Sequence, residues 1–268
     1  MQGIDLYEGA GSVDWPAVAA SGVGFAIVKA TEGATIRDAR FRTHWPAIRH
    51  AGLIRGAYHF FYAATSTPEA QADAFLAALG TPEERDLPPT LDIEEASLQS
   101  VDAAIVIERL RTWLDRVERR LRTPSGKPLR PLIYTNVDTW NQLGNPDGFS
   151  DHPLWIASPG SGAPEIPVPF GRNDWLIHQT AFEQSAAGVS GKVDTNVDHA
   201  LARGAHGARV RDVQQRLKGL LAEALDPGAV DGAFGPKTEA AVRAFQRTRR
   251  LTVDGVVGLR TWVTLIWS

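Results

Sequence analysis

The chain has 268 residues with no cysteine, 28 basic and 31 acidic side chains, and 43% hydrophobic residues. The lack of cysteine excludes a disulfide framework and any thiolate metal site. No apolar run approaches the ~20 residues that a membrane span needs, so we expect no membrane insertion. The length predicts one large domain of about 200 residues followed by a small one.

Eight short apolar runs alternate with longer amphipathic stretches over the first 200 residues. Such alternation predicts buried parallel strands joined by helices. The runs are Gly3–Leu6, Phe25–Val28, Gly56–Phe60, Thr90–Glu94, Leu132–Thr135, Leu154–Ala157, Trp175–His178 and Val193–Val197. Eight is the number of strands in a closed parallel barrel, so the predicted fold class is α/β with a TIM-like barrel.

The clearest helix is expected over residues 101–121. Its apolar residues recur at spacings of three and four, which places them on one face. These residues are Ile107, Leu110, Leu114, Val117 and Leu121. Ser100 is expected to be the N-cap.

The alternation stops between Leu201 and Gly207, where small residues accumulate. We therefore predict two domains, residues 1–203 and 204–268. The second part carries 10 basic and 6 acidic residues, against 18 and 25 in the first. A positive tail could favour an anionic polymer, but it has no dense run of Lys and Arg, so nucleic acid is not expected as a partner.

The tail contains an internal repeat, in which Val230–Thr238 recurs as Val253–Thr261. Each copy predicts a tight turn at Asp-Gly, a second Gly, and a Thr that caps a helix. Apolar stripes flank the copies and predict a small all-α unit of three helices. The stripes are Val210, Val213, Leu217 and Leu221, then Ala241, Val242 and Phe245.

The pair Asp92 and Glu94 at the end of a buried strand is the strongest candidate for chemistry. Side chains two apart on a strand point the same way, here toward the mouth where barrel enzymes hold their active sites. Two neighbouring carboxylates repel, so one keeps a proton near neutral pH. Glycoside hydrolysis needs such a pair. The alternative is a structural pair that caps the next helix or binds Arg.

Further acids fall on other predicted strand ends: Asp5, Glu32 and Asp194. In a closed barrel the first and last strands are neighbours, so Asp5 and Asp194 should face each other at one rim. The aromatic residues Tyr58, Tyr134 and Trp155 lie at or beside strand ends. Aromatic faces stack on sugar rings, although each of these residues could instead be core.

Other chemistries have little support in the sequence. The seven histidines show no zinc-ligand spacing, and the chain has neither a nucleophile elbow nor a phosphate loop. We therefore expect no metal and no cofactor.

The stretch from Gly3 to about Leu201 resembles family 25 glycoside hydrolases, the Chalaropsis-type lysozymes. The resemblance lies in short segments around these residues and in the order in which they occur. The matching segments are Gly3–Asp5, Val13–Trp15, Lys29–Gly33, Tyr58–Phe60, Leu91–Glu94, Leu154–Ala157 and Val193–Asn196. The tail is similar to type 1 peptidoglycan-binding domains, through Val213–Leu217, the two repeats and Ala244–Gln246. The chain departs from the first family at Tyr7 and at Ala10–Gly11, where we expect different rim contacts.

The resemblance implies a muramidase with an irregular barrel that cleaves the β-1,4 bond between N-acetylmuramic acid and N-acetylglucosamine. Glu94 would be the acid, and Asp92 would hold the acetamido group or stabilise the developing positive charge. Asp5 and Asp194 would line the cleft and keep the pKa of Glu94 high. Tyr58, Glu32, Tyr134 and Trp155 would contact the substrate. The expected partner is the peptidoglycan glycan strand, bound by a monomer.

The first residues lack the basic segment and apolar core of a secretory signal. With the family resemblance, this predicts a phage endolysin that is made in the cytoplasm and released by a holin-type pore. Two alternatives remain: a wall-binding protein with an inactive barrel, and a chitin-cleaving enzyme, which the tail disfavours.

Overall fold

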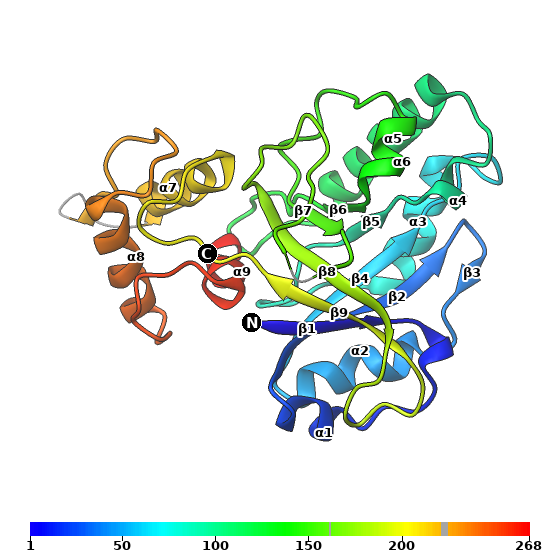
Figure 1. The fold of residues 1–268 in the computed structure, drawn as a ribbon, viewed down its shortest axis with the longest axis horizontal. Coiled ribbons are helices and arrows are strands. Elements are labelled where there is room, and N and C mark those ends of the chain that lie inside the picture. Colours follow the sequence, from blue (N-terminus) through cyan, green and yellow to red (C-terminus); the bar gives the residue numbers. More distant parts are fainter. Residues whose placement is uncertain (161, 221–224) are drawn as a thin grey trace.

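A computed structural model describes residues 1–160, 162–220 and 225–268 (Figure 1). The first part of the chain is a barrel of strands surrounded by helices. Its strands are β1 (Gln2–Leu6), β2 (Val23–Glu32), β3 (Ile36–Arg37), β4 (Ile54–Phe60), β5 (Thr90–Asp92), β6 (Leu132–Thr135), β7 (Leu154–Ala157), β8 (Trp175–Gln184) and β9 (Val193–Asp198). Its helices are η1 (Glu8–Ala10), α1 (Trp15–Ala20), α2 (Phe41–His50), α3 (Pro68–Leu79), α4 (Glu95–Leu98), α5 (Ala103–Arg120) and α6 (Val137–Gln142).

Eight strands close the barrel, in the order β1-β9-β8-β7-β6-β5-β4-β2, with β2 pairing back to β1. The short strand β3 only extends β2 as a hairpin. The closed barrel and the eight expected strands are therefore confirmed. Strand β5 ends at Asp92, two residues earlier than expected. The backbone of Glu94 stays extended, with φ −123° and ψ 173°, as the N-cap of α4.

The expectation that all eight strands are parallel is wrong for the last one. Strand β9 is antiparallel to both β8 and β1. Only eight residues separate Gln184 from Val193. A parallel crossover needs about a dozen residues or more, so this connection can only make a hairpin.

The predicted helix over residues 101–121 is confirmed as α5, with Val106, Leu110, Trp113, Leu114 and Val117 buried. Its N-cap is Asp102, whose side chain accepts a hydrogen bond from the Ala104 amide at 2.9 Å. The expected cap, Ser100, is wrong. Its φ of 58° places it in the left-handed turn that precedes the helix.

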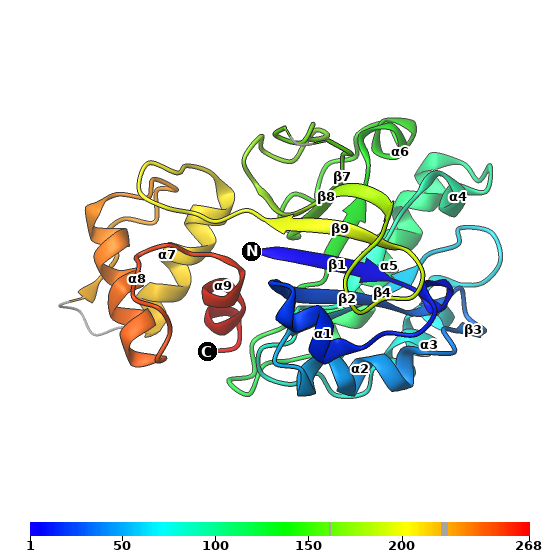
Figure 2. The same ribbon diagram turned by 60° about the horizontal axis from the view of Figure 1, so that its bottom comes forward.

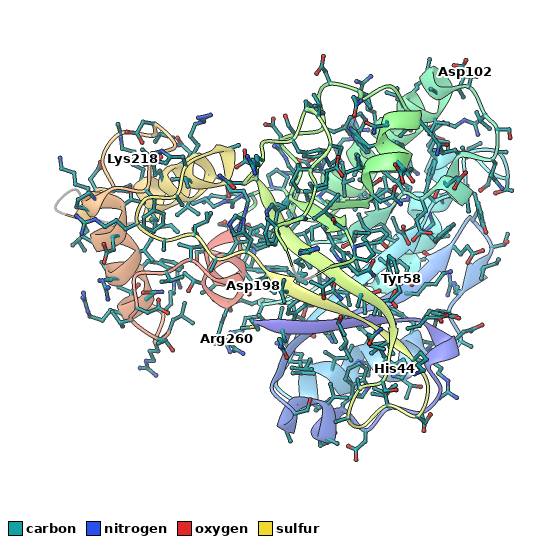
Figure 3. The ribbon with its side chains drawn as sticks, in the orientation of Figure 1. His44, Tyr58, Asp102, Asp198, Lys218 and Arg260 are labelled. Carbon is teal, nitrogen blue, oxygen red and sulfur yellow. The ribbon has the colours of Figure 1, made fainter. Side chains whose placement is uncertain are left out.

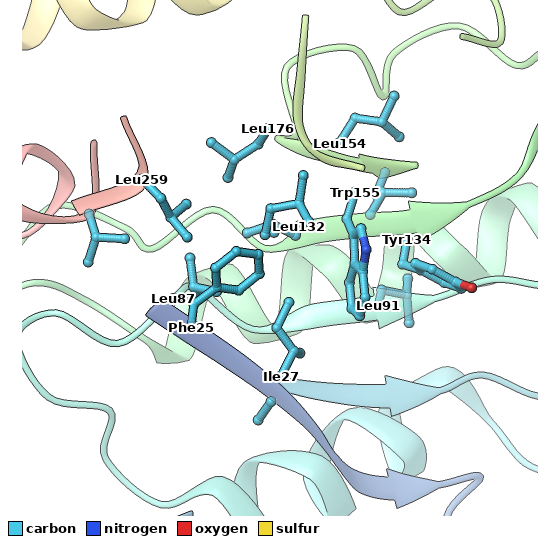
Figure 4. Close-up of a cluster of buried hydrophobic side chains, with 14 of the residues drawn as sticks. Phe25, Ile27, Leu87, Leu91, Leu132, Tyr134, Leu154, Trp155, Leu176 and Leu259 are labelled. Atoms are coloured by element: carbon cyan, nitrogen blue, oxygen red, sulfur yellow. The ribbon is translucent and has the colours of Figure 1, made fainter. Parts of the chain in front are cut away.

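The barrel interior is filled by apolar side chains from successive strands and their entry loops (Figure 4). Phe25, Ile27 and Leu132 are all fully buried. Leu259 from the tail joins the same cluster. The core of the barrel is therefore continuous with the core of the tail.

The tail contains three helices among the described residues, α7 (Ala208–Leu220), α8 (Pro236–Thr248) and α9 (Leu259–Ile266). The predicted stripe residue Leu221 lies outside the described residues. Val210, Val213 and Leu217 are buried, as expected. The 203/204 domain boundary falls between β9 and α7 and stays a prediction.

Each repeat in the tail is held by one buried glutamine. The Gln214 amide nitrogen donates to Asp231 Oδ1, Ala233 O and Thr238 Oγ1, and its oxygen accepts from the Gly232 amide. Gln246 repeats all four contacts with Asp254, Val256, Thr261 and Gly255. The prediction that Thr238 and Thr261 cap the helices is wrong, because the N-caps are Gly235 and Gly258. Each threonine instead accepts a hydrogen bond from the buried glutamine of its repeat.

The tail covers one end of the barrel, the end at which β1 begins (Figure 2). Leu259 N donates to Asp198 Oδ2 at 2.6 Å, and the Trp267 indole donates to the Asp86 carbonyl at 2.8 Å. Because β1 runs away from the tail, the carboxyl ends of the parallel strands open at the opposite end. No described helix has both the length and the apolar character needed to cross a membrane.

Candidate active site

The antiparallel direction of β9 brings its first residues to the open end of the barrel. Asp194 is therefore the direct partner of Asp5 across the β1–β9 ladder. A parallel β9 would have placed Asp194 near the opposite rim. Asp5 and Asp194 therefore face each other as predicted, but they do so because β9 is antiparallel, which we did not predict.

Asp92 and Glu94 reach the same rim from β5 and the residues that follow it. Asp92 is 4% exposed, and its Oδ1 accepts no hydrogen bond from the described residues. Burial, followed by the charge of Glu94, raises the pKa of Asp92 well above its usual range. Glu94 is only partly buried. The Asp92 carboxyl therefore lies below the surface, whereas the Glu94 carboxyl is accessible from it.

Burial also raises the pKa of Glu94, and the charge of Asp194 adds to this effect. Lys29 and the nearby Tyr134 hydroxyl act in the opposite direction. The net shift is upward, which favours the protonated acid. A carboxyl that holds its proton more firmly is suited to the role of a general acid.

A hydrogen-bond network holds Asp5 beneath the mouth. Its Oδ2 accepts from Gln179 Nε2 at 2.9 Å and from Asn196 Nδ2 at 2.7 Å. The Trp155 indole donates to Asn196 Oδ1 at 2.8 Å. Burial and the charge of Asp194 nevertheless raise the pKa of Asp5 to about 7.

Two neighbouring cavities open at this end, and Asp194 lines both. The larger, about 500 Å³, has Glu94, Tyr134, Asn136 and Phe182 in its wall. The smaller, about 100 Å³, is lined by Asp5, Tyr7, Tyr58 and Lys192 among others. Figure 3 places Tyr58 on the side of the barrel away from the tail. We call these two cavities together the groove, and their walls are acidic and aromatic.

The four expected contact residues take different positions. Tyr58 and Tyr134 line the groove, as a contact role requires. Trp155 lies below it, 2% exposed and packed edge-on against both tyrosines. A direct contact of Trp155 with a ligand does not fit this placement, because the two tyrosines and Asn196 occupy its surroundings.

Glu32 lines neither cavity and is held by its neighbours on β2 and the loop after β4. It forms an ion pair with Lys29 and accepts from the Tyr62 hydroxyl at 2.8 Å. Burial acts to raise the pKa of Glu32, but these two partners outweigh it and the pKa is lowered. Glu32 stays ionised and holds Lys29, whose charge acts on Asp92 and Glu94.

The sequence reasoning missed Lys29, Gln179, Asn196 and Phe182 as residues of the site. A signal for two of them was present. Asn196 is two residues after Asp194 on one strand, and Gln179 is a polar residue that directly follows a buried run. Phe182 lies beyond the predicted end of its strand, so only the hairpin brings it to the groove. Across the described residues, no cluster of His, Asp or Glu could hold a metal ion.

Comparison with known proteins places both parts of the chain in families. The sequence model for glycosyl hydrolases family 25 matches residues 4–189. A model described as a peptidoglycan binding domain matches residues 206–265.

Individual relatives agree with these matches. The chain is 35% identical to Lysozyme M1 of Streptomyces globisporus over 200 residues, which cover 73% of this chain and 67% of that protein. It is 32% identical to the Autolytic lysozyme of Clostridium acetobutylicum, over 97% of this chain and 77% of that protein. The crystal structure of a bacterial lysozyme from Streptomyces coelicolor is similar with a TM-score of 0.67 at 33% identity, and covers 74% of this chain and 91% of that one.

Proposed function

This chain belongs to glycosyl hydrolase family 25, and from that membership and the geometry of the groove we propose that it is a muramidase. It hydrolyses the β-1,4 bond between N-acetylmuramic acid and N-acetylglucosamine in peptidoglycan. The relatives named as lysozymes support the reaction class. The groove has acidic and aromatic walls, which suit a glycan strand.

One observation carries the assignment of the acid. Glu94 is partly buried, lines the larger cavity and has a raised pKa, while Asp92 lies buried behind it with a raised pKa as well. Glycosidic cleavage requires an acid that is protonated when the substrate binds. Among the four carboxyls of the mouth, we assign this role to Glu94.

The arrangement supports a substrate-assisted route. Glu94 donates its proton to the glycosidic oxygen while the bond from that oxygen to C1 breaks, and the bonding electrons pass to the oxygen. The carbonyl oxygen of the substrate's acetamido group bonds to C1. We assign the acetamido N–H to Asp92, whose buried Oδ1 has no donor among the described residues. Because Asp92 lines neither cavity, the bound substrate has to open a path to it. Water then adds to C1 as the bond from C1 to the acetamido oxygen breaks and its electrons return to the acetamido group. Ionised Glu94 takes a proton from the water, and configuration is retained.

Asp5 and Asp194 keep the mouth acidic, and their charges oppose ionisation of the other carboxyls. Tyr58 and Tyr134 contact the sugar rings. Trp155 and Glu32 act through Asn196 and Lys29.

We also propose that the tail holds the enzyme on the cell wall. The description of its family and its net positive charge support this role, because wall polymers are often anionic. The repeat residues Gln214 and Gln246 are committed to internal hydrogen bonds. The wall-binding surface is therefore made of other residues. Release by a holin-type pore stays a prediction.

The test is the reducing ends released from purified peptidoglycan, identified by mass spectrometry, for the native sequence, Glu94→Gln and Glu95→Gln. Glu95 is the exposed next residue and serves as the matched control. Muramic acid reducing ends are expected, with a rate loss of about 100-fold or more in Glu94→Gln alone, because general acid catalysis contributes about 10²–10⁴-fold.

Three outcomes would overturn parts of this proposal. Glucosamine reducing ends would move the enzyme to a different specificity. Equal losses in Glu94→Gln and Glu95→Gln would remove Glu94 from the acid role. Wall binding without any product would indicate an inactive barrel.

A further inference from the structure

Two aromatic side chains of the groove differ from all others in the protein because they are exposed. Among the described residues, Tyr7 and Phe182 are the only exposed aromatic side chains, at 55% and 46%. Tyr7 lines the smaller cavity and Phe182 lines the larger one. An aromatic ring that stays in water forgoes the free energy of its burial. One such ring in each cavity of the groove therefore indicates two surfaces that a ligand covers.

The ring of Tyr7 lies where a side chain at position 9 would lie. A Cβ atom added at Gly9 would come within 2.5 Å of Tyr7 Cζ and 2.6 Å of the Tyr7 hydroxyl oxygen. Only the absence of a side chain at Gly9 lets the ring take this place. Gly9 belongs to the wall of the same cavity. The chain at Gly9 therefore supports the Tyr7 ring, while more than half of the tyrosine stays exposed.

A β-bulge brings Phe182 into the groove. Two residues of β8, Phe182 and Glu183, stand opposite the single residue Asp194 of β9. Glu183 has a φ of 50°, in the left-handed region that favours glycine, and its amide donates to Asp194 Oδ1 at 2.8 Å. Phe182 lines the larger cavity, whereas Glu183 lines the smaller one. Bulges next to active sites commonly redirect a side chain in this way.

The two rings lie on either side of Asp194, which lines both cavities. Strand β9, which carries Asp194, lies between β1 and β8 in the barrel. Tyr7 directly follows β1, and Phe182 belongs to β8. We propose that Tyr7 and Phe182 are sugar-stacking residues that hold the glycan strand on opposite sides of the cleaved bond. The inference rests on the proposed function, because it takes a glycan strand as the occupant of the groove.

The polar groups around the two rings suit this occupant. A sugar presents C–H groups on its faces, which an aromatic ring covers, and hydroxyl and amide donors on its edge. Carboxylates, which accept hydrogen bonds, line the same cavities: Glu183 in the smaller one, and Asp138 and Glu165 in the larger one. An apolar ligand would cover the rings but leave these carboxylates without donors.

The test is the position at which an octasaccharide is cut. It consists of alternating N-acetylglucosamine and N-acetylmuramic acid, and its reducing end is chemically reduced so that mass spectrometry distinguishes the two ends. Tyr7→Ala should move the preferred bond toward one end and Phe182→Ala toward the other, because each variant loses the sugar contact on one side. Each should also raise KM roughly tenfold. An unchanged position in either variant, or shifts toward the same end, would overturn the proposal.

Three further variants separate the loss of a ring from other effects. Tyr7→Phe and Phe182→Tyr keep the ring, and each should restore the native cutting position. Gly9→Ala forces the Tyr7 ring to move and should shift the cut in the same direction as Tyr7→Ala. Ile105→Ala removes an exposed apolar side chain on α5, outside both cavities, and should leave activity and cutting position unchanged.

NMR of protein labelled with ¹³C in its Tyr and Phe rings tests the contact without turnover. The signals of Tyr7 and Phe182 are assigned from the two alanine variants. Saturating octasaccharide should shift both signals in Glu94→Gln protein. Native protein that releases no product would end the muramidase assignment, while shifted ring signals would still support the two contacts. Ring signals that stay unmoved would overturn this inference, whether or not the native protein releases product.

Discussion

Asp5 shows how a single residue can couple the mouth to the stability of the whole barrel. Burial and the charge of Asp194 raise its pKa from 3.8 to about 7, against the hydrogen bonds from Asn196 and Gln179. Between about pH 4 and 7 the folded protein therefore binds a proton that the unfolded chain releases. The contribution of Asp5 to stability falls as pH rises through this window.

We predict that Asp5→Asn removes this dependence. The Asn oxygen can still accept from Gln179 and Asn196, but it cannot ionise. At pH 8 the variant should be more stable than the native protein by about 2–4 kcal/mol, and the advantage should vanish toward pH 4. Urea unfolding across pH 4–8 measures the difference. Asp147→Asn, an exposed carboxyl outside both cavities, is the control. A constant difference across the pH range would contradict the prediction.

At the scale of elements, single buried side chains fix the geometry of loops that have little regular structure. In the tail, Gln214 satisfies the Gly232 amide, the Ala233 carbonyl and the Thr238 hydroxyl at once. The Asp-Gly-x-x-Gly-x-x-Thr pattern is therefore a folding unit built around a glutamine of the preceding helix. The residues of this pattern are therefore explained by their contacts within the fold, without a bound ligand.

We predict that Gln214→Ala lowers the free energy of unfolding by about 2–4 kcal/mol, because it leaves several buried polar groups without partners. Gln215→Ala provides a matched control, since this neighbour on α7 is exposed. Its effect should stay within about 0.5 kcal/mol. Urea unfolding of both variants makes the comparison, and similar losses would show that the Gln214 contacts contribute little.

At the scale of the whole molecule, the tail covers the end of the barrel at which β1 begins, and its buried residues pack there. Leu259, Trp262, Ile266 and Trp267 are all at most 5% exposed. The main-chain groups of Leu201 and Val257 pair in both directions, at 2.8 and 3.1 Å. Figure 3 shows Asp198 and Arg260 at this junction, at the opposite side of the barrel from Tyr58. The groove and the tail therefore lie at opposite ends of the molecule.

We predict that the full chain unfolds in one calorimetric transition and that Trp267→Ala lowers stability by about 3–5 kcal/mol while the transition stays single. The expected loss of stability combines the cost of the cavity that the indole leaves with the cost of a buried Asp86 carbonyl that has lost its hydrogen-bond donor. Val253→Ala, a truncation on the exposed surface of the tail, is the control. Two separated transitions in the native protein would show that the tail and barrel are independent.

Much of this protein follows from sequence alone. The apolar runs give the eight strands, the spacing along α5 gives its buried face, and Asp5, Asp92, Glu94 and Asp194 stand out because acids seldom recur at strand ends by chance. These are local patterns, and local spacing decides which side chains share a face. The resemblance to family 25 depends on the same short segments.

Only the tertiary structure decided the direction of β9, the burial of Trp155, the pairing of Glu32 with Lys29, and the orientation of Gln179 between three strands. Each depends on residues far apart in the chain, and no local pattern encodes such distances. The attachment of the tail is of the same kind. Leu259 begins a short amphipathic helix, and only the folded structure brings it into the buried cluster that includes Leu87 and Leu132 of the barrel. Burial in that cluster stabilises its position.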